Sequence, residues 1–283
     1  MCQECLDPGR QIEMGKKTND IEWYRRAAEQ EHPEAWSRIG LTLVARTRPE
    51  EGIRILEQEY KKRIPLASLF LGACYYNGKG VEKNERRAFD LFFEASTLGI
   101  PEGDLRLGDC FMKGIGVEKN EKVAFLLYTK VRHFYEAEVK IAECYLNGTG
   151  VEQDQVKAFE GFRKFLAKSE VARYRYAECL YKGVGCVQNR EIAIVRFRKE
   201  AENDSLEAQQ ILGYCLLQGT DVKRDVNEAF KWLLKASRGG NPCTQYNLGI
   251  CYQDGLGVEK NEDLATMWFE RAATQRAWKK YSV

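Results

Sequence analysis

The sequence predicts an all-α solenoid of about seven to eight helix-pair repeats. A four-residue motif, LGAC at Leu71, recurs as LGDC, IAEC, YAEC, LGYC and LGIC, with successive starts at residues 71, 107, 141, 176, 212 and 248. Each copy contains two stretches whose apolar residues follow a helical period, and a glycine-rich turn joins them. One such helix pair cannot bury its apolar face alone, so a chain of this kind is expected to stack its repeats into one continuous core.

The composition is that of a folded chain without a membrane span. Of its 283 residues, 44% are hydrophobic and 30% are charged, so we expect neither disorder nor a membrane-embedded fold. The 44 basic and 42 acidic residues are interspersed and give a net charge of +2, which disfavours nucleic acid as a partner. No apolar run approaches the ~18 residues of a transmembrane helix. The first residues also lack the apolar segment of a secretory signal.

The repeats extend toward both ends of the chain. A weaker copy begins at Arg38, and residues 21–35 have the pattern of the second half of an eighth copy. We therefore expect residues 1–19 to form an N-terminal tail, ordered or disordered, and residues 20–275 to form the solenoid. Residues 276–283 are expected to form a C-terminal cap or tail. Trp278 and Tyr281 either cover the last helix pair there or form a self-association surface.

Each repeat is expected to contain two amphipathic helices. In the first helix, small and apolar residues recur every four positions, as at Thr244, Leu248 and Tyr252, and therefore share one face. The second helix carries the pattern Ala-Phe-x-x-Phe-x-x-Ala, as in residues 88–95.

The turn between the two helices contains Gly-x-Gly, which is either a phosphate-binding loop or a joint. The first glycine directly follows the first helix, where a left-handed cap favours glycine. These positions are Gly78, Gly114, Gly148, Gly183, Gly219 and Gly255. The second glycine supplies another turn position at which positive φ is tolerated. These positions are Gly80, Gly116, Gly150, Gly185 and Gly257, with Asp221 in the remaining copy.

A good helix N-cap closes each of these turns. Four residues before the first alanine of the second helix stand Asn84, Asn120, Asp154, Asn189, Asp225 and Asn261. A phosphate loop would instead follow a buried strand, and a P-loop would end in Gly-Lys-Ser/Thr. Neither feature is present, so we interpret the motif as a joint.

The pattern A-x-x-x-L-G-x-x-Y-x-x-G-x-G-V-x-x-D/N-x-x-x-A resembles the Sel-1-like repeat, a relative of the tetratricopeptide repeat. Residues 244–273, TQYNLGICYQDGLGVEKNEDLATMWFERAA, match this pattern almost throughout, and the resemblance covers residues 20–275. It implies a right-handed α–α superhelix and, for function, an adaptor or scaffold that binds other proteins. The glycine that this family places between units is expected at Gly99 and Gly239.

Six cysteines occupy one repeat position and are expected to be small buried hydrophobes. They are Cys74, Cys110, Cys144, Cys179, Cys215 and Cys251. Equivalent positions in neighbouring repeats are expected to lie farther apart than the ~4.4–6.8 Å Cα separation of a disulfide. Free thiols favour a reducing compartment, hence the cytoplasm, with the nucleus as an alternative. Cys2 and Cys5 form a lone CxxC without a second ligand pair, so no zinc site is predicted.

The sequence contains no recognisable catalytic set. His32 and His133 both fall at boundaries between units, where surface or packing roles are expected. Patterns such as GxSxG, HExxH and Walker A are absent, so we predict neither catalytic nor metal-binding nor cofactor-binding residues.

The first helices are expected, by resemblance to tetratricopeptide arrays, to line a concave face that binds a partner. Two rows of residues would point into it, namely the residue before each cysteine and the residue three positions later. The predicted partner-binding residues are Tyr76, Asp109, Met112, Glu143, Leu146, Glu178, Tyr181, Tyr214 and Leu217. The second row is almost wholly apolar, so it forms either a groove or packing against a neighbouring helix. Asp109, Glu143 and Glu178 would add an acidic wall, suited to a peptide with apolar anchors and basic residues.

The leading function hypothesis is a non-enzymatic scaffold or adaptor for a protein or peptide, with no nucleic acid and no membrane involved. The alternative is a regulatory accessory module of a signalling or ubiquitin-pathway complex. A cysteine-dependent redox or hydrolytic enzyme is a remote alternative. The pathway, the partner and the oligomeric state are not predicted.

Overall fold

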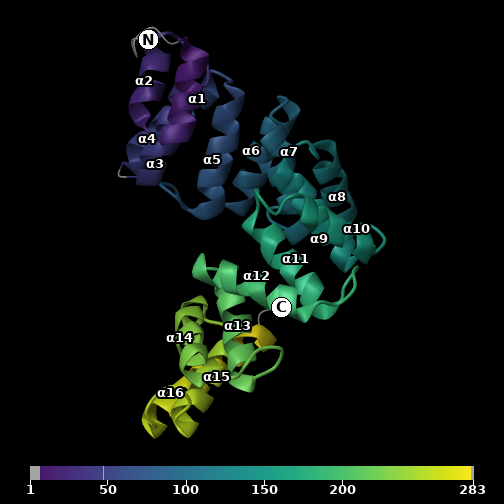
Figure 1. The fold of residues 1–283 in the computed structure, drawn as a ribbon. Helices are drawn as coiled ribbons and strands as arrows, with labels where there is room; N and C mark the ends of the chain where they lie inside the picture. Colours follow the sequence, from purple (N-terminus) through teal and green to yellow (C-terminus); the bar gives the residue numbers. More distant parts are fainter. Residues whose placement is uncertain (1–6, 47, 282–283) are drawn as a thin grey trace. The chain divides into compact units, whose positions relative to one another are not determined.

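The computed structural model describes residues 7–46 and 48–281, with side chains described up to residue 274. The described chain is built from sixteen α-helices and one short 3₁₀ helix, without strands (Figure 1). The helices form eight successive pairs, which confirms the predicted fold class. The first four pairs are α1 (Pro8–Thr18) with α2 (Ile21–Glu29), α3 (Ala35–Arg46) with α4 (Pro49–Lys61), α5 (Pro65–Asn77) with α6 (Glu85–Thr97), and α7 (Pro101–Lys113) with α8 (Glu121–Lys130). The fifth, in chain order, consists of α9 (Tyr135–Asn147) and α10 (Gln155–Lys164). The last three are α11 (Glu170–Lys182) with α12 (Arg190–Glu202), α13 (Leu206–Gln218) with α14 (Val226–Ala236), and α15 (Pro242–Asp254) with α16 (Glu262–Tyr281).

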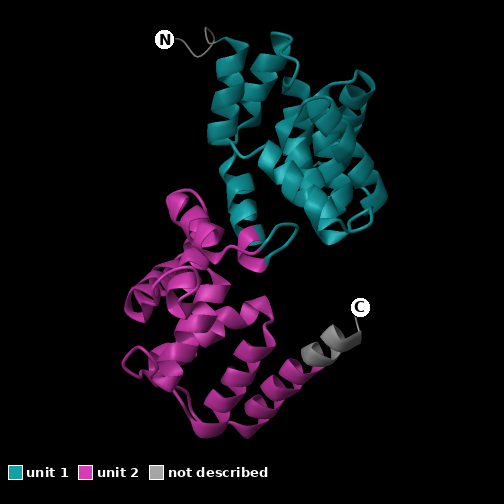
Figure 2. Ribbon diagram, turned by 90° about the vertical axis from the view of Figure 1, so that its right-hand side faces the viewer, with its two compact units in different colours: residues 1–144, 148–152 teal, residues 145–147, 153–283 magenta. Residues whose placement is uncertain are grey.

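The chain divides into two compact units (Figure 2). Unit 1 comprises residues 1–144 and 148–152, and unit 2 comprises residues 145–147 and 153–283. Within unit 1 the helices pack in chain order, with α2 against α3, α4 against α5 and α6 against α7. Unit 2 follows the same rule from α10 to α16. Each unit therefore buries its apolar faces between neighbouring repeats, as stacking requires.

The Gly-x-Gly turn is a joint, as predicted. The first glycine of each turn is the left-handed C-cap of the first helix, for example Gly78 at φ 66°. Its N–H donates to the carbonyl of Cys74, and the next N–H, of Lys79, donates to the same carbonyl at 3.0 Å. At the other end of the turn, the Asn84 side chain accepts a hydrogen bond from the N–H of Arg87. The same hydrogen-bond pattern recurs in the other five copies, so each turn caps both helices that it joins.

The second glycine allows two repeats to approach closely. A Cβ atom on Gly150 would lie 2.1 Å from the carbonyl oxygen of Glu121, the first residue of α8. A Cβ atom on Gly185 would lie 2.0 Å from the carbonyl oxygen of Gln155 on α10. A Cβ atom on Gly257 would lie 2.1 Å from that of Val226 on α14. Asp221 replaces this glycine once and adopts φ 64°, as expected of an aspartate.

The N-terminal segment differs from the predicted tail. Residues 8–18 form α1, which packs on α2 and buries Ile12. Gly15 lies against the ring of Tyr24, in the way that Gly72 lies against Phe92 in a full repeat. Met14-Gly15 therefore corresponds to the Leu-Gly of the motif, and Asn19 at φ 53° replaces the glycine C-cap. Because the cysteine and both turn glycines are missing here, the repeat motif does not identify this helix pair.

The junctions between successive repeats also contain residues with positive φ. Gly99 has φ 81°, and the corresponding position in the last junction is Gly240 at φ 67°, rather than the predicted Gly239. Gly239 instead ends the 3₁₀ helix η2 (Ser237–Gly239). Where glycine is absent, Asp204 adopts φ 63° in its place.

The six motif cysteines are free thiols buried in the repeat core. Burial raises the pKa of Cys74, Cys110, Cys144, Cys179 and Cys251 to about 11. Burial also raises the pKa of Cys215. This is the environment expected for cysteine acting as a small hydrophobe. Cys2, Cys5 and the side chains of Trp278 and Tyr281 lie outside the described residues.

Candidate interaction groove

A groove in unit 2 is formed by the first helices of three consecutive repeats, α11, α13 and α15. It has a volume of about 420 Å³. Its lining residues come from these three helices and, at one position, from α12. They are Glu178, Tyr181, Lys182, Phe197, Gln210, Ile211, Tyr214, Cys215, Cys243, Tyr246 and Asn247. Three of them, Glu178, Tyr181 and Tyr214, are among the residues that the sequence predicts to bind a partner.

Aromatic side chains dominate this groove. Tyr181, Tyr214 and Tyr246 come from α11, α13 and α15, one from each repeat. Tyr214 is 46% exposed and Tyr246 is 50% exposed, whereas Phe197 is fully buried beneath the groove. Tyrosine rings that remain half exposed can cover apolar groups of a ligand while their hydroxyls stay hydrated or hydrogen-bonded.

Tyr181 is held in position from several sides. Its hydroxyl donates to a carboxylate oxygen of Asp221 at 3.2 Å and lies 3.6 Å from the Sγ of Cys215. The guanidinium of Arg190 lies 5.4 Å from the ring centroid and also pairs with Asp221 at 3.2 Å. Burial and these hydrogen bonds raise the pKa of Tyr181 above its ordinary value. The aspartate that replaces a turn glycine therefore fixes one wall of the groove.

The charges at the groove compensate one another. Glu178 pairs with Lys182 at 2.6 Å and with Arg175 at 2.9 Å. Burial tends to raise the pKa of Glu178, but the hydrogen bonds from Lys182 and Arg175 outweigh it and lower the pKa. Glu178 is therefore an ionised, internally paired carboxylate.

The other predicted site residues have different surroundings. Leu217 is 3% exposed and belongs to the core of unit 2, since the apolar row packs inward at this repeat. Tyr76 is half-buried against the cluster that contains Phe92 and Cys110. Asp109 pairs with Lys140 at 2.7 Å. Met112, Glu143 and Leu146 are partly buried. None of these six residues lines the groove.

Sequence reasoning missed the residues one helical turn earlier. Ile211 and Asn247 stand four positions before the cysteine of their repeats, and Tyr246 stands five positions before it. The signal that could have identified them is the 3.6-residue period, which places these positions beside the predicted rows. Cys243, the second residue of α15, also lines the groove, and its N–H donates to the Asn241 side chain at 2.8 Å.

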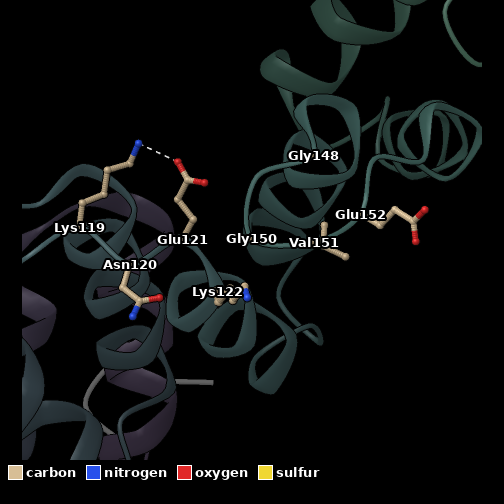
Figure 3. A pocket seen from close by; sticks show the side chains of 8 residues that line it. All are labelled: Lys119, Asn120, Glu121, Lys122, Gly148, Gly150, Val151 and Glu152. Atoms are coloured by element: carbon tan, nitrogen blue, oxygen red, sulfur yellow. Dashed lines mark ion pairs between the residues drawn. The ribbon is translucent and has the colours of Figure 1, made fainter.

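A second cavity tests the phosphate-loop alternative directly (Figure 3). It lies in unit 1 between the start of α8 and the turn that contains Gly148 and Gly150. The N–H of Val123, near the start of α8, already donates to the Asn120 side chain at 3.1 Å. The carboxylates of Glu121 and Glu152 line the same cavity, and Glu121 pairs with Lys119 at 2.7 Å. Lys119 and Lys122 also line the cavity, but the two carboxylates balance their charge, so the lining offers an anion no net positive charge and the geometry favours the joint.

The histidines lie where the sequence predicts, at boundaries between repeats. His32 accepts a hydrogen bond through Nδ1 from the N–H of Glu34 at 3.3 Å. His133 is exposed, with its ring centroid 4.3 Å from that of Phe134. Among the described residues, no group of three or more His, Cys, Asp and Glu side chains is placed to hold a metal ion. No described helix is long and apolar enough to cross a membrane.

The stacked helix pairs and the groove on their first helices define a helical-repeat protein. The Sel1 repeat model matches residues 21–32, 65–100, 101–130, 136–164, 171–195, 206–241 and 244–276. The chain therefore belongs to the Sel1 repeat family, which confirms the resemblance inferred from the turn motif. Proteins of this family are generally protein-interaction scaffolds and typically not enzymes.

Curated relatives share only part of their length with this chain. The chain is 40% identical over 67 residues to the chitin synthase regulator SKT5 of Saccharomyces cerevisiae, covering 22% of this chain and 10% of that protein. It is 33% identical over 84 residues to DAP3-binding cell death enhancer 1 of Mus musculus, covering 30% of this chain and 16% of that protein. It thus spans less than a fifth of either relative.

Solved structures agree over much more of the chain. A Sel1 repeat protein from Oxalobacter formigenes superposes with a TM-score of 0.72 at 25% identity, covering 83% of this chain and 96% of that one. The protective antigen c5321 of uropathogenic Escherichia coli superposes with a TM-score of 0.64 at 27% identity, covering 95% of this chain and 62% of that one.

Proposed function

We propose that this protein is a non-enzymatic scaffold that binds a short segment of a partner protein in the groove formed by α11, α13 and α15. The observation that carries the proposal is the pair of half-exposed rings, Tyr214 and Tyr246, over an apolar floor. Exposed aromatic side chains in a concavity are the anchors that most often dominate protein–protein binding energy. The cavity volume of about 420 Å³ falls in the range of ligand sites and suits a few peptide residues.

The partner chemistry follows from the lining residues. Apolar anchors of the partner would contact Tyr181, Tyr214 and Ile211, while Gln210 and Asn247 offer hydrogen bonds to its backbone. Basic partner residues, predicted from the acidic row, would have to compete with cations of the chain itself, because Glu178 is already paired. Apolar contacts are therefore given the larger part in this proposal.

A regulatory role is the alternative that the relatives favour. One similar protein is named a chitin synthase regulator, and another is named for binding DAP3. A repeat scaffold within a regulatory complex would use the same groove, so the two hypotheses differ in pathway rather than in mechanism.

The test is a selection of peptides from a displayed random library on the full chain. Affinities of the selected peptides are then measured for wild type, for Tyr214→Ala/Tyr246→Ala, and for Val195→Ala, a control on α12 whose side chain is 70% exposed. We expect the double variant to lose at least about tenfold in affinity and the control to bind like wild type. Peptides that bind the double variant as tightly as wild type would contradict the proposal.

A further inference from the structure

The groove has the chemistry of a site for an uncharged, extended peptide. Each of its charged residues, Glu178 and Lys182, has its partner within the chain, at 2.6 Å from the other. A charged ligand side chain entering here would compete with this pair, whose Lys182 side chain is 58% exposed, and would gain little from a solvent-screened contact. Charge complementarity therefore favours a segment without charged residues.

The size and the lining of the groove decide between a helix and an extended segment. An α-helix with its side chains is about 10–12 Å across, and its anchors spread over two turns or more. A volume of about 420 Å³ lies toward the small end of the range for ligand sites, which matches a few residues in an extended form. Three tyrosines contributed one by one from consecutive repeats also form a row rather than a single deep hole.

We propose that the occupant of this groove is a proline-rich segment of a partner protein in the polyproline II conformation. This inference rests on the proposed function and names its ligand class. Proline-rich segments bind grooves lined with aromatic side chains, because flat rings pack on pyrrolidine rings and the ligand is already ordered before it binds. A polyproline II helix also leaves its carbonyls free, and the Asn247 amide and the Tyr214 hydroxyl line the groove as donors.

The groove is itself pre-organised for such a ligand. Tyr181 is fixed by Asp221 and Arg190, and the ring of Tyr246 lies 5.4 Å from that of Phe269. Two of the three groove tyrosines therefore already have partners within the chain. Binding therefore costs little conformational entropy on either side.

The test uses a fluorescein-labelled decaproline peptide, with a labelled (Gly-Ser)₅ peptide as the matched flexible control. Anisotropy titrations are made with the full chain, with Tyr214→Ala/Tyr246→Ala and with Val195→Ala. A further variant, Tyr214→Phe/Tyr246→Phe, retains both rings and tests whether the rings themselves bind. We expect saturable binding of decaproline but not of (Gly-Ser)₅. Affinity should fall at least tenfold in the double Ala variant and change less than threefold in the Val195 variant. The Phe variant, which keeps both rings and loses only the hydroxyl hydrogen bonds, should bind with an affinity between these two limits.

The outcomes separate this inference from the proposed function. If decaproline fails to bind while library-selected peptides still depend on Tyr214 and Tyr246, the proline-rich ligand is wrong and the groove function stands. If decaproline binds all variants equally, it binds elsewhere and the inference is overturned. If neither decaproline nor any selected peptide depends on the two tyrosines, both proposals are overturned.

Discussion

The hydroxyl of Tyr128 donates a hydrogen bond to the carboxylate of Asp109, with an oxygen–oxygen distance of 2.9 Å. Tyr128 is buried on α8, and Asp109 lies on α7 of the same repeat. Lys140 on α9 pairs with the same carboxylate at 2.7 Å. An aspartate predicted to face a partner thus ties three helices of unit 1 together.

Replacing Tyr128 with Phe tests this role. Removing the hydroxyl is expected to lower the free energy of unfolding by about 1 kcal/mol, because one buried hydrogen bond is lost while Lys140 still satisfies Asp109. Urea denaturation provides the measurement. Tyr214→Phe is the control, and its half-exposed side chain should change stability by less than about 0.5 kcal/mol. Equal stability of wild type and Tyr128→Phe would show that the Tyr128–Asp109 hydrogen bond does not stabilise the repeat.

Gly150→Ala tests the close approach of two repeats. Position 150 combines φ 72° with a Cβ that would lie 2.1 Å from the Glu121 carbonyl oxygen. The left-handed conformation costs about 1–2 kcal/mol, and steric overlap with a backbone atom adds about 1–3 kcal/mol.

Gly99→Ala is the matched control for this glycine. Its φ is 81°, but a Cβ there meets no atom within 4 Å. Gly99→Ala should therefore show the conformational cost alone. The difference between the losses of unfolding free energy in Gly150→Ala and Gly99→Ala then measures the steric cost at the contact between repeats. Equal destabilisation by the two substitutions would refute the steric argument.

The buried cysteines predict how stability depends on alkaline pH. Their pKa is raised from an ordinary value near 9 to about 11, so the unfolded chain loses these protons at a lower pH than the folded chain. Stability is fully present below about pH 9 and falls as pH rises toward 11. Replacing Cys110 and Cys251 with Ala should reduce this slope by at most about 1 kcal/mol per pH unit per thiol. Urea denaturation of wild type and the double Ala variant between pH 8 and 10.5 measures how the unfolding free energy changes with pH. This slope does not depend on how much stability the substitutions themselves cost at pH 8.

Asp221 is expected to position the groove rather than to stabilise the fold. Asp221→Gly places glycine at this turn position, as in the other repeats, and removes the conformational cost of a side chain at φ 64°. It also removes the carboxylate that accepts a hydrogen bond from Tyr181 and pairs with Arg190. We expect the unfolding free energy to change by less than about 1 kcal/mol, since these effects oppose each other. Affinity for a library-selected groove peptide should fall several-fold. Asp221→Asn, which keeps an oxygen acceptor for Tyr181, should bind like wild type, and a peptide affinity unchanged in Asp221→Gly would contradict this role.

The sequence predicted the local geometry of the repeats because that geometry depends on neighbouring residues. Gly78 and Asn84 are the cap residues whose own conformations and hydrogen bonds form one turn. The same residue types recur at the same spacing, so each additional copy supports the interpretation of the others. α1 shows the limit of this approach, because Met14-Gly15 has the packing of the motif without its cysteine or turn glycines.

The groove, in contrast, is lined by residues of several repeats, and no pattern within one helix shows that they lie together. Helical spacing could place Tyr181 and Tyr214 at equivalent positions, but the contribution of Tyr246 required the tertiary structure, which brings residues of α11, α13 and α15 to one groove. Asp109 appeared as part of an acidic row because its partner Lys140 comes from the next repeat, which sequence spacing does not reveal. The partners of Glu178, in contrast, stand three and four positions away at Arg175 and Lys182, where helical spacing does predict ion pairs. Leu217 looked like a groove residue, yet it is buried in the core.

By itself, then, the sequence determined the repeat, its caps, its family and the free thiols at one core position, since each is fixed by interactions within about 35 residues of chain. Only the tertiary structure decided which apolar side chains remain exposed and which charges are paired across repeats. Those properties depend on contacts between neighbouring repeats, such as Lys140 with Asp109 and Tyr181 with Asp221, which the pattern within one helix does not contain.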